Sequence, residues 1–170
     1  LAVNEDGSRL LSASFDRTAR LWSLPDGQPQ GTLSGHFGSV SAAIFVPRRS
    51  IIATASYDQS IKIWDSDTRE LRATLAGHTS DIWSLAASPD GSMLASGDKS
   101  GHVKLWDPRV TQPVQDGFQY PTNTAAHTGF TEDGLNVYWR ATDDRLMIAE
   151  MARPHQPQAV SGRFPKAPRL

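Results

Sequence analysis

Short runs of β-branched and apolar residues, separated by polar turn residues, recur along most of the chain. The clearest set consists of four runs, at residues 39–46, 50–56, 60–65 and 70–75. Pro, Asp, Ser and Gly lie between or beside these runs. Close, even spacing of such runs, with turn signals between them, favours an antiparallel meander of short strands. The pattern therefore predicts an all-β protein.

The links between the first and second runs of each set carry a turn signal of their own. Residues 4–7 (NEDG), 88–91 (SPDG) and 131–134 (TEDG) each end in Asp-Gly, and residues 46–50 (VPRRS) take this place in the clearest set. Asp supplies a side-chain acceptor, and Gly is free to adopt a positive φ, as a tight hairpin turn requires. These links are therefore expected to be hairpin turns.

The four-run set repeats along the chain with a period of 42 residues. The stretch SFDRTARLW aligns without a gap with SYDQSIKIW, and GTLSGH aligns with ATLAGH. A fixed period of this length indicates a supersecondary unit that buries its core against copies of itself. The residues that recur at this interval are Trp22, Trp64 and Trp106, then His36 and His78, and finally Asp16 and Asp58.

These repeats resemble the WD-repeat family of β-propellers. They share an Asp turn, a Trp six residues later with Asp or Ser after it, and a Gly-His whose His lies 28 residues before the next Trp. The resemblance is strong over residues 1–107 and weak over 108–150. It implies propeller blades, each a four-stranded antiparallel sheet. Since three to four repeats are fewer than is usual in that family, we expect an open arc of blades, not a closed ring.

The repeat boundaries divide the chain into five predicted segments. Leu1 already lies inside the pattern, so we expect the chain to be a fragment of a longer protein that holds the remainder of the propeller. The last segment is rich in Pro, Lys and Arg, and is predicted to be a tail or the start of another blade. The segments are a truncated first blade (1–34), a second (35–76), a third (77–120), a degenerate fourth (121–150) and the last segment (151–170).

The resemblance also implies a buried polar network in each blade. In the family it joins the His of Gly-His, a Ser or Thr of the second strand, the Asp of the turn and the Trp of the third strand. Each of these buried polar groups then has a hydrogen-bond partner. The residues to which the resemblance gives this structural role are Ser12, Asp16, Trp22, His36, Thr54, Asp58, Trp64, His78 and Trp106.

The third and fourth copies depart from the pattern. Ser100 stands where the first two copies have the turn Asp. Asp98 lies two residues earlier and on the other side of the pleat, where only a rearranged turn would bring it close, so we expect a weaker network in the third blade. In the fourth copy, Ala149 and Glu150 replace the Trp-Asp pair. No Gly-His precedes this copy, and His127 lies too close to the turn to match. The fourth copy is therefore predicted to be a degenerate or capping blade.

Composition and charge narrow the range of partners. The 170-residue chain has a formal net charge of -1 at pH 7 and no Cys. Because the chain has no net positive charge, nucleic acid is not favoured as its main partner. Zero Cys removes thiol catalysis and thiolate metal sites, and agrees with a reducing compartment. No apolar run is long enough to span a bilayer. We therefore expect a soluble cytoplasmic protein without cofactors or membrane insertion.

Two catalytic interpretations of the polar residues are disfavoured. The recurring Ser, His and Asp residues are predicted to be buried within each sheet, whereas a hydrolase triad needs an open cleft and an oxyanion site. A zinc site is disfavoured because no short-spaced His pair falls on one predicted strand face. We therefore expect no enzyme activity and no metal site at the five histidines, which are His36, His78, His102, His127 and His155.

The predicted function is that of a protein-protein interaction scaffold. The alternative is a regulatory or sensing propeller domain of a larger protein, with a kinase or hydrolase domain outside this chain; a catalytic propeller ranks third. Exposed aromatics with neighbouring charges are typical of interaction hot spots, although Phe15 and Tyr57 could simply pack over the adjacent blade. The predicted partner-binding residues are Phe15, Arg17, Tyr57, Asp81, Trp83 and Lys99.

Overall fold

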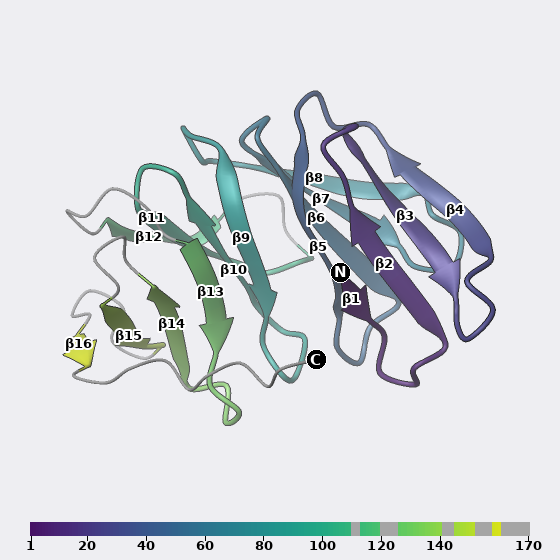
Figure 1. Cartoon of the computed structure of the whole chain (residues 1–170). Coiled ribbons are helices and arrows are strands. Elements are labelled where there is room, and N and C mark those ends of the chain that lie inside the picture. Colours follow the sequence, from purple (N-terminus) through teal and green to yellow (C-terminus); the bar gives the residue numbers. More distant parts are fainter. Residues whose placement is uncertain (110–112, 120–125, 141–144, 152–157, 161–170) are drawn as a thin grey trace.

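The structure is a computed structural model that describes residues 1–109, 113–119, 126–140, 145–151 and 158–160. In these ranges the regular elements are all β-strands, and they form four antiparallel sheets of four strands each (Figure 1). The strands of every sheet lie in chain order. This meander confirms the predicted all-β propeller blades, which we number 1 to 4 along the chain.

The bounds of the strands follow the predicted period. Blade 1 comprises β1 (Ala2–Val3), β2 (Arg9–Ala13), β3 (Thr18–Ser23) and β4 (Pro29–Ser34). Blade 2 comprises β5 (Val40–Val46), β6 (Ile51–Ser56), β7 (Ser60–Asp65) and β8 (Leu71–Ala76). Blade 3 comprises β9 (Ile82–Ala87), β10 (Leu94–Asp98), β11 (His102–Trp106) and β12 (Pro113–Gln119). Blade 4 comprises β13 (Ala126–Phe130), β14 (Asn136–Arg140), β15 (Leu146–Glu150) and β16 (Gln158–Val160).

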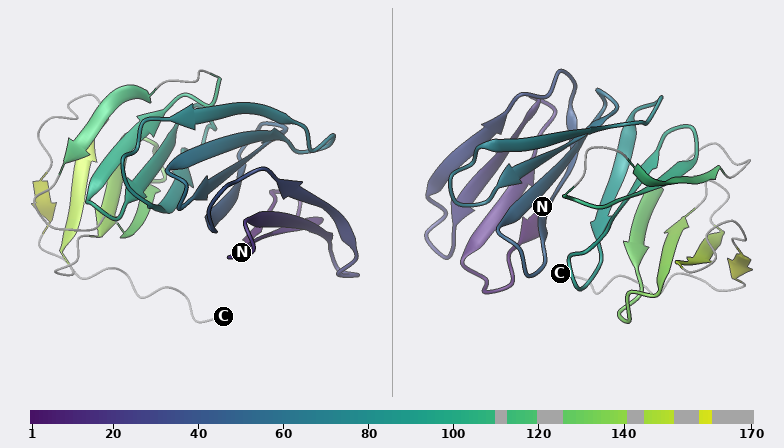
Figure 2. Two further views of the ribbon diagram at one scale, coloured as in Figure 1. Left: turned by 90° about the horizontal axis from the view of Figure 1, so that it is seen from above. Right: turned by 180° about the vertical axis from the view of Figure 1, so that it is seen from behind.

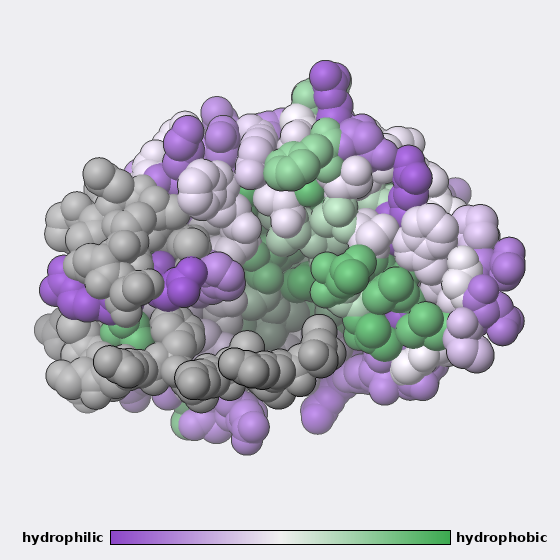
Figure 3. Space-filling view, viewed as in Figure 1, coloured by the Kyte–Doolittle hydropathy of each residue, from purple (hydrophilic) through white to green (hydrophobic). Residues whose placement is uncertain are grey.

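The blades stack side by side into an open arc. Figure 2 shows blades 1 and 4 at opposite ends of the arc, with open space between them. The first strand of each blade is in contact with the first strand of the next, from β1 to β5, β5 to β9 and β9 to β13. These first strands line the concave side, where Figure 3 shows apolar residues around a hollow. The predicted partial propeller is therefore confirmed.

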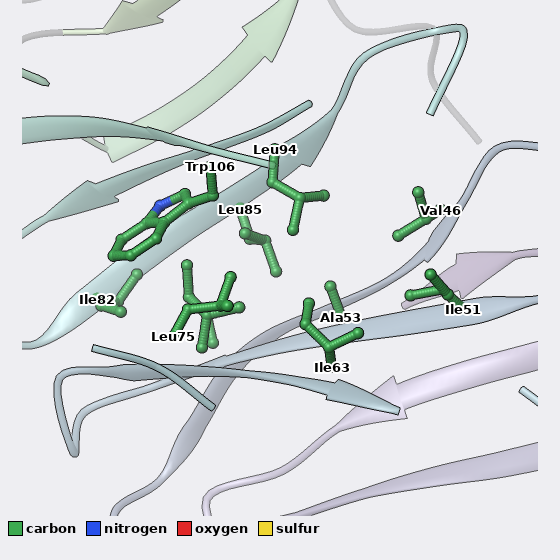
Figure 4. Close-up of a cluster of buried hydrophobic side chains, with 11 residues drawn as sticks. Val46, Ile51, Ala53, Ile63, Leu75, Ile82, Leu85, Leu94 and Trp106 are labelled. Carbon is green, nitrogen blue, oxygen red and sulfur yellow. The ribbon is translucent and has the colours of Figure 1, made fainter. Parts of the chain in front are cut away.

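Three apolar clusters fill the spaces between successive blades. Each cluster contains a buried Trp of the later blade, namely Trp64, Trp106 or Trp139. In Figure 4, Leu75 and Ile63 of blade 2 and Trp106 of blade 3 belong to the middle cluster. Removing this apolar surface from water stabilises the stack by about 25 cal/mol for each Å² buried. Blade-to-blade packing thus supplies the core that no single sheet has.

Blade 4 fills its part of this core with a different Trp. Ala149 takes the position of the Trp in the earlier repeats, as the sequence indicates, and it is buried. Trp139, on the neighbouring strand β14, packs with Ala149 against Val103 and Leu105 of blade 3. The large aromatic surface is therefore kept, although its position in the repeat has changed.

The fourth sheet also extends further along the chain than the sequence pattern indicates. The predicted boundary of the fourth blade is at residue 150, with residues 151–170 as a separate segment. Gln158–Val160 instead forms β16, which pairs antiparallel with β15 from Ile148↔Gln158 to Leu146↔Val160. This part of the predicted tail is the outer strand of blade 4; the remainder, residues 152–157 and 161–170, lies outside the described residues.

The face of blade 1 that points away from blade 2 is only partly buried, in contrast to the equivalent faces of blades 2 and 3, which a preceding blade covers. Trp64 and Trp106 are 3% and 0% exposed, whereas Trp22 is only partly buried. Leu10 pairs with Trp22 as Ile52 pairs with Trp64, yet Ile52 is fully buried and Leu10 is not. The same strand register therefore gives a buried face only where a preceding blade covers it.

One Asp-Gly turn contributes to the contact between blades 2 and 3. Gly91 has a φ of +67°, and a Cβ added there would lie 2.1 Å from the carbonyl oxygen of Pro47. Gly7, in the equivalent turn of blade 1, has a φ of +73° and open space around it. Both turns require the left-handed conformation, but only Gly91 also requires the absence of a side chain.

These two glycines give a matched test of the interface. We expect Gly7→Ala to lower the free energy of unfolding by about 1 kcal/mol, the cost of a left-handed Ala. Gly91→Ala should cost about 1 to 3 kcal/mol more, because its methyl group displaces the Pro47 backbone. Urea denaturation of both variants measures the difference. Equal destabilisation would show that the Pro47 contact does not hold blades 2 and 3 together.

Candidate functional site

The polar network of blade 2 joins four side chains in one hydrogen-bonded chain. The Nδ1 atom of His36 lies 2.8 Å from Oδ2 of Asp58, and its Nε2 lies 2.8 Å from Oγ1 of Thr54. The indole Nε1–H of Trp64 donates to the same Oγ1 over 2.9 Å. Since a carboxylate only accepts, His36 carries its proton on Nδ1, and Thr54 donates to Nε2. Every polar atom of this buried chain is therefore paired.

Burial and hydrogen bonding set the charges of this network. Burial alone would raise the pKa of Asp58, but hydrogen bonds from Ser60, His36 and the backbone N–H of Phe37 lower this pKa to about 2. Burial lowers the pKa of the His36 imidazole, and the adjacent Asp58 offsets only part of this effect. Near neutral pH the network therefore consists of an ionised carboxylate and a neutral imidazole.

Blade 3 has an equally complete network, which corrects the expectation of a weaker one. The Nδ1 atom of His78 lies 2.8 Å from Oδ2 of Asp98, and its Nε2 lies 2.7 Å from Oγ of Ser96. The indole of Trp106 donates to Ser96 over 2.8 Å. Asp98, which the sequence pattern places two residues early, is the carboxylate of this network, and Ser100 is not a substitute for it.

A single residue in blade 3 replaces two residues of blade 2. In blade 2, Ser56 Oγ accepts from the N–H of Asp58, and Asp58 Oδ1 accepts from the N–H of Ser60. In blade 3, Oδ1 of Asp98 accepts both equivalent bonds, from the N–H groups of Ser100 and His102. Asp98 occupies the strand position of Ser56, beside a β-bulge. An Asp two residues early thus still reaches the histidine.

The network of blade 1 is incomplete among the described residues. Trp22 Nε1–H donates to Ser12 Oγ over 2.9 Å, as in the other blades. The carboxylate of Asp16 is exposed and accepts from Thr18 and from Arg20, whose Nη2 lies 2.8 Å from Oδ2. No histidine of the described residues bonds to Ser12 or Asp16. Blade 1 therefore holds the Ser-Trp half of the network alone.

An aromatic cavity lies at the concave side and is lined by residues from all four blades. Its volume is about 330 Å³. Phe15 is 75% exposed and Trp83 is 40% exposed, while Tyr57 is partly buried. The rings of Phe15 and Tyr57 are 6.1 Å apart between centroids and tilted by 59°. The lining residues are Ala13, Phe15, Val40, Ser41, Tyr57, Trp83, Ser84 and His127.

We refer to this pocket as the aromatic cavity, and its aromatic residues come from three different blades. Phe15 lies in the β2–β3 turn and Tyr57 in the equivalent β6–β7 turn, while Trp83 belongs to β9. These three are members of the predicted partner-binding set, and the fold brings them together. The rings of Phe15 and Tyr57 contact each other across neighbouring blades, as packing over the adjacent blade requires. Both rings also line the cavity, as a binding role requires.

The three charged members of the predicted set do not line the cavity. Lys99 takes the turn position in blade 3 that Tyr57 takes in blade 2: its N–H donates to the carbonyl of Asp81, as that of Tyr57 donates to Ser39. Arg17 lies two residues after Phe15 in the same turn, with a φ of 72°. Arg17 and Lys99 therefore share with Phe15 and Tyr57 the turns between the second and third strands of their blades, which Figure 1 shows.

Sequence reasoning missed the polar part of the cavity lining. Ser41 and Ser84 lie in the first strands of blades 2 and 3, and His127 lies near the start of β13. In the sequence pattern His127 fits neither a metal site nor the family's Gly-His, so the pattern gives it no role. Ser41 lies one period of 42 residues before Trp83 and therefore occupies the equivalent position in blade 2. This equivalence is the signal in the sequence that could have identified Ser41.

The hydroxyl groups of the blade 2 and blade 3 networks, which would be the candidate nucleophiles of an enzyme, are buried and already hydrogen-bonded. The hydroxyls of Thr54 and Ser96 are buried, and each is bonded to an imidazole and an indole. Within the described ranges, no group of three or more His, Cys, Asp or Glu side chains is placed to hold a metal ion. The part of the chain that the structure describes also contains no helix long and apolar enough to cross a membrane.

Removal of the blade 2 carboxylate tests its structural role. We expect Asp58→Ala to destabilise the protein by about 1 to 3 kcal/mol, because the buried imidazole of His36 loses its acceptor. Asp16→Ala is the matched control, since the exposed Asp16–Arg20 ion pair should contribute less than about 1 kcal/mol. Thermal unfolding of both variants measures this. A thermal midpoint unchanged by Asp58→Ala would contradict the structural role.

The same groups predict that acid destabilises the fold. Burial lowers the pKa values of His36 and His78 below the ordinary value, so the unfolded chain binds more protons than the folded chain as pH falls below about 6.5. Asp58, with its pKa lowered to about 2, adds a further loss below about pH 4. Urea midpoints should therefore fall steadily from pH 7 to pH 3, and a flat profile would contradict the assignment.

Comparisons with known proteins agree with the geometry. The family model described as "WD domain, G-beta repeat" matches residues 1–23, 27–65 and 69–107. A human protein, "WD repeat-containing protein 86", is 56% identical over 36 residues, which are 21% of this chain and 10% of that protein. The chain thus covers about a tenth of the length of this curated relative. The family model covers more than half of the chain, and the chain therefore belongs to the WD40 repeat family.

Proposed function

We propose that this chain is part of a protein-interaction scaffold whose partner binds over the aromatic cavity. WD40 repeats generally mediate protein-protein interactions. The observation that supports the proposal most directly is the convergence of Phe15, Tyr57 and Trp83, from three blades, on one cavity. A cytoplasmic location is part of the proposal, since a chain without Cys needs no oxidising compartment.

The exposure of these rings supports a role in binding. Phe15 and Trp83 are two of the most exposed aromatic side chains in the described part of the chain, together with Phe37. Exposed apolar surface gathered at one site is costly in water and marks interaction sites. Aromatic residues also dominate binding energy at interfaces, because they bury a large area with little side-chain entropy to lose. The cavity has the composition of such a hot spot.

The polar groups of the blades support binding in preference to catalysis. The hydroxyl, imidazole and carboxylate groups of blades 2 and 3 are engaged with one another inside the sheets. A nucleophile requires access to substrate and an adjacent base that is not already committed. The aromatic cavity itself contains His127 and two serines, and the hydroxyl of Ser41 already bonds to the carbonyl of Ile82 at 2.6 Å.

Replacement of Trp83 tests the proposal. Peptides selected for binding from a random displayed library should bind Trp83→Ala roughly thirtyfold more weakly than the unaltered protein, which corresponds to about 2 kcal/mol. The control is Leu71→Ala, which removes an exposed apolar side chain on an outer strand. It should leave affinity unchanged. Calorimetric titration gives the affinities, and thermal unfolding should show that Trp83→Ala leaves the fold intact.

Two results would contradict the proposal. The first is that no peptide or protein ligand depends on the aromatic cavity, so that Trp83→Ala and Leu71→Ala bind alike. The second is that Trp83→Ala lowers the thermal midpoint as strongly as Asp58→Ala does. The Trp83 side chain would then serve the fold, and its exposure would have no role in binding.

A further inference from the structure

The lining of the aromatic cavity defines the kind of side chain that it accepts. Its lining is mainly aromatic and aliphatic, with Ala13 and Val40 in addition to the three rings, and Ser41, Ser84 and His127 as its polar members. Ser41 offers little to a ligand, because its hydroxyl lies within hydrogen-bond distance of the carbonyls of Ile82 and Ala55. A volume of about 330 Å³ is at the lower end of the range for ligand pockets. The cavity therefore suits a single large apolar side chain.

The charges around the cavity are predominantly positive. Arg17 and Lys99 are exposed on the turns between the second and third strands of blades 1 and 3. Neither side chain forms an ion pair within the described ranges of the chain. Arg140 adds a third cation beside the cavity, since its Nη2 lies 3.4 Å from Nδ1 of the lining residue His127. A ligand at this rim meets Arg17 of blade 1 and Lys99 of blade 3.

The acidic residues of the same turns are engaged within the protein. Asp16 accepts hydrogen bonds from Thr18 and Arg20, and Asp58 is bonded to His36, Ser60 and the N–H of Phe37. Asp81 is the remaining acid of the predicted binding set, and it is partly buried. The exposed Asp16 carboxylate is therefore offset by Arg20, whereas Arg17 and Lys99 form no ion pair among the described residues.

We propose, on the basis of the function proposed above, that the aromatic cavity takes an apolar side chain from a peptide whose flanking residues are acidic. The apolar side chain enters among Phe15, Tyr57 and Trp83. The acidic flanks lie against Arg17 on one side and Lys99 on the other. Complementary charges of this kind set the choice of partner and the rate of association more than the strength of binding.

A cationic ligand is the main competing occupant. Aromatic rings also attract ammonium groups through their quadrupoles, and a methylated lysine is a ligand of this chemistry. The positive rim opposes it, because the cation would approach Arg17 and Lys99, while the exposed carboxylate of Asp16, next to Phe15 in the chain, already pairs with Arg20. The two occupants therefore differ in the sign of charge that the rim should favour.

Three synthetic peptides distinguish these occupants. Each is fluorescently labelled and has the same length; the first has Phe flanked by Asp, the second has Phe flanked by Lys, and the third has trimethyl-lysine flanked by Gly. We expect the Asp-flanked peptide to bind at least tenfold more tightly than the other two at low salt, by fluorescence anisotropy. Its advantage should shrink as salt approaches 1 M, where exposed charges are screened within about 3 Å.

Charge-reversed variants assign this preference to the rim. The double variant Arg17→Glu, Lys99→Glu should lose the preference for the Asp-flanked peptide or reverse it. Arg48→Glu is the matched control, because Arg48 is also exposed on a tight turn, but this turn joins β5 to β6 at the other end of the strands from the turns that carry Arg17 and Lys99. It should leave the preference unchanged. Trp83→Ala should weaken all peptides that bind in the cavity.

The outcomes separate this inference from the function that it rests on. If the Lys-flanked or trimethyl-lysine peptide binds more tightly, and Trp83→Ala weakens that binding, the acidic preference is wrong while the interaction site stands. The same holds if the charge-reversed double variant keeps the original preference. If no peptide, synthetic or selected, shows binding that depends on Trp83, the proposed function and this inference both fail.

Discussion

The buried bond between an imidazole and a carboxylate determines the shape of the concave rim. His36 follows the outer strand of blade 1, and its bond to Asp58 fixes the loop that leads into β5 against the β6–β7 turn. Gly38 makes this contact possible, since a Cβ there would lie 2.7 Å from the nitrogen of Asp58. Tyr57 precedes that Asp, so the buried pair also positions one wall of the aromatic cavity. Stability and the proposed binding site thus depend on the same bond.

Each repeat places two sets of side chains in different environments, one inside the sheet and one on the turns of the rim. Ser, Thr, His, Asp and Trp side chains of the networks bond to one another inside the sheets, where an unpaired polar group would cost about 1 to 3 kcal/mol. The aromatic and cationic side chains of the neighbouring turns have no such partners inside and project from the rim. Phe15, Tyr57 and Lys99 occupy one equivalent position, so the side chain at this position of the rim differs from blade to blade.

Blades 1 and 4 show which part of the repeat is easier to lose. Blade 4 keeps a buried apolar face, although its Trp139 lies on a different strand from the Trp of the other blades. Blade 1 keeps the Ser12–Trp22 bond, although Asp16 turns to Arg20. Apolar packing is non-directional and tolerates a shifted side chain, whereas the network requires each donor to meet its acceptor. The polar network is accordingly the part that varies between blades.

The sequence by itself determined the blades, because the period, the turn residues and the alternation along each strand are local properties. It also indicated the network of blade 2 at His36, Thr54, Asp58 and Trp64, through the family resemblance. It placed Asp98 two residues too early for this role, since the hydrogen bonds that carry Asp98 to His78 form only when the β10–β11 turn folds around it. Only the tertiary structure brought His127 and Ser84 beside Phe15, Tyr57 and Trp83. That convergence depends on the angle at which separate blades stack, and no local pattern in the sequence encodes this angle.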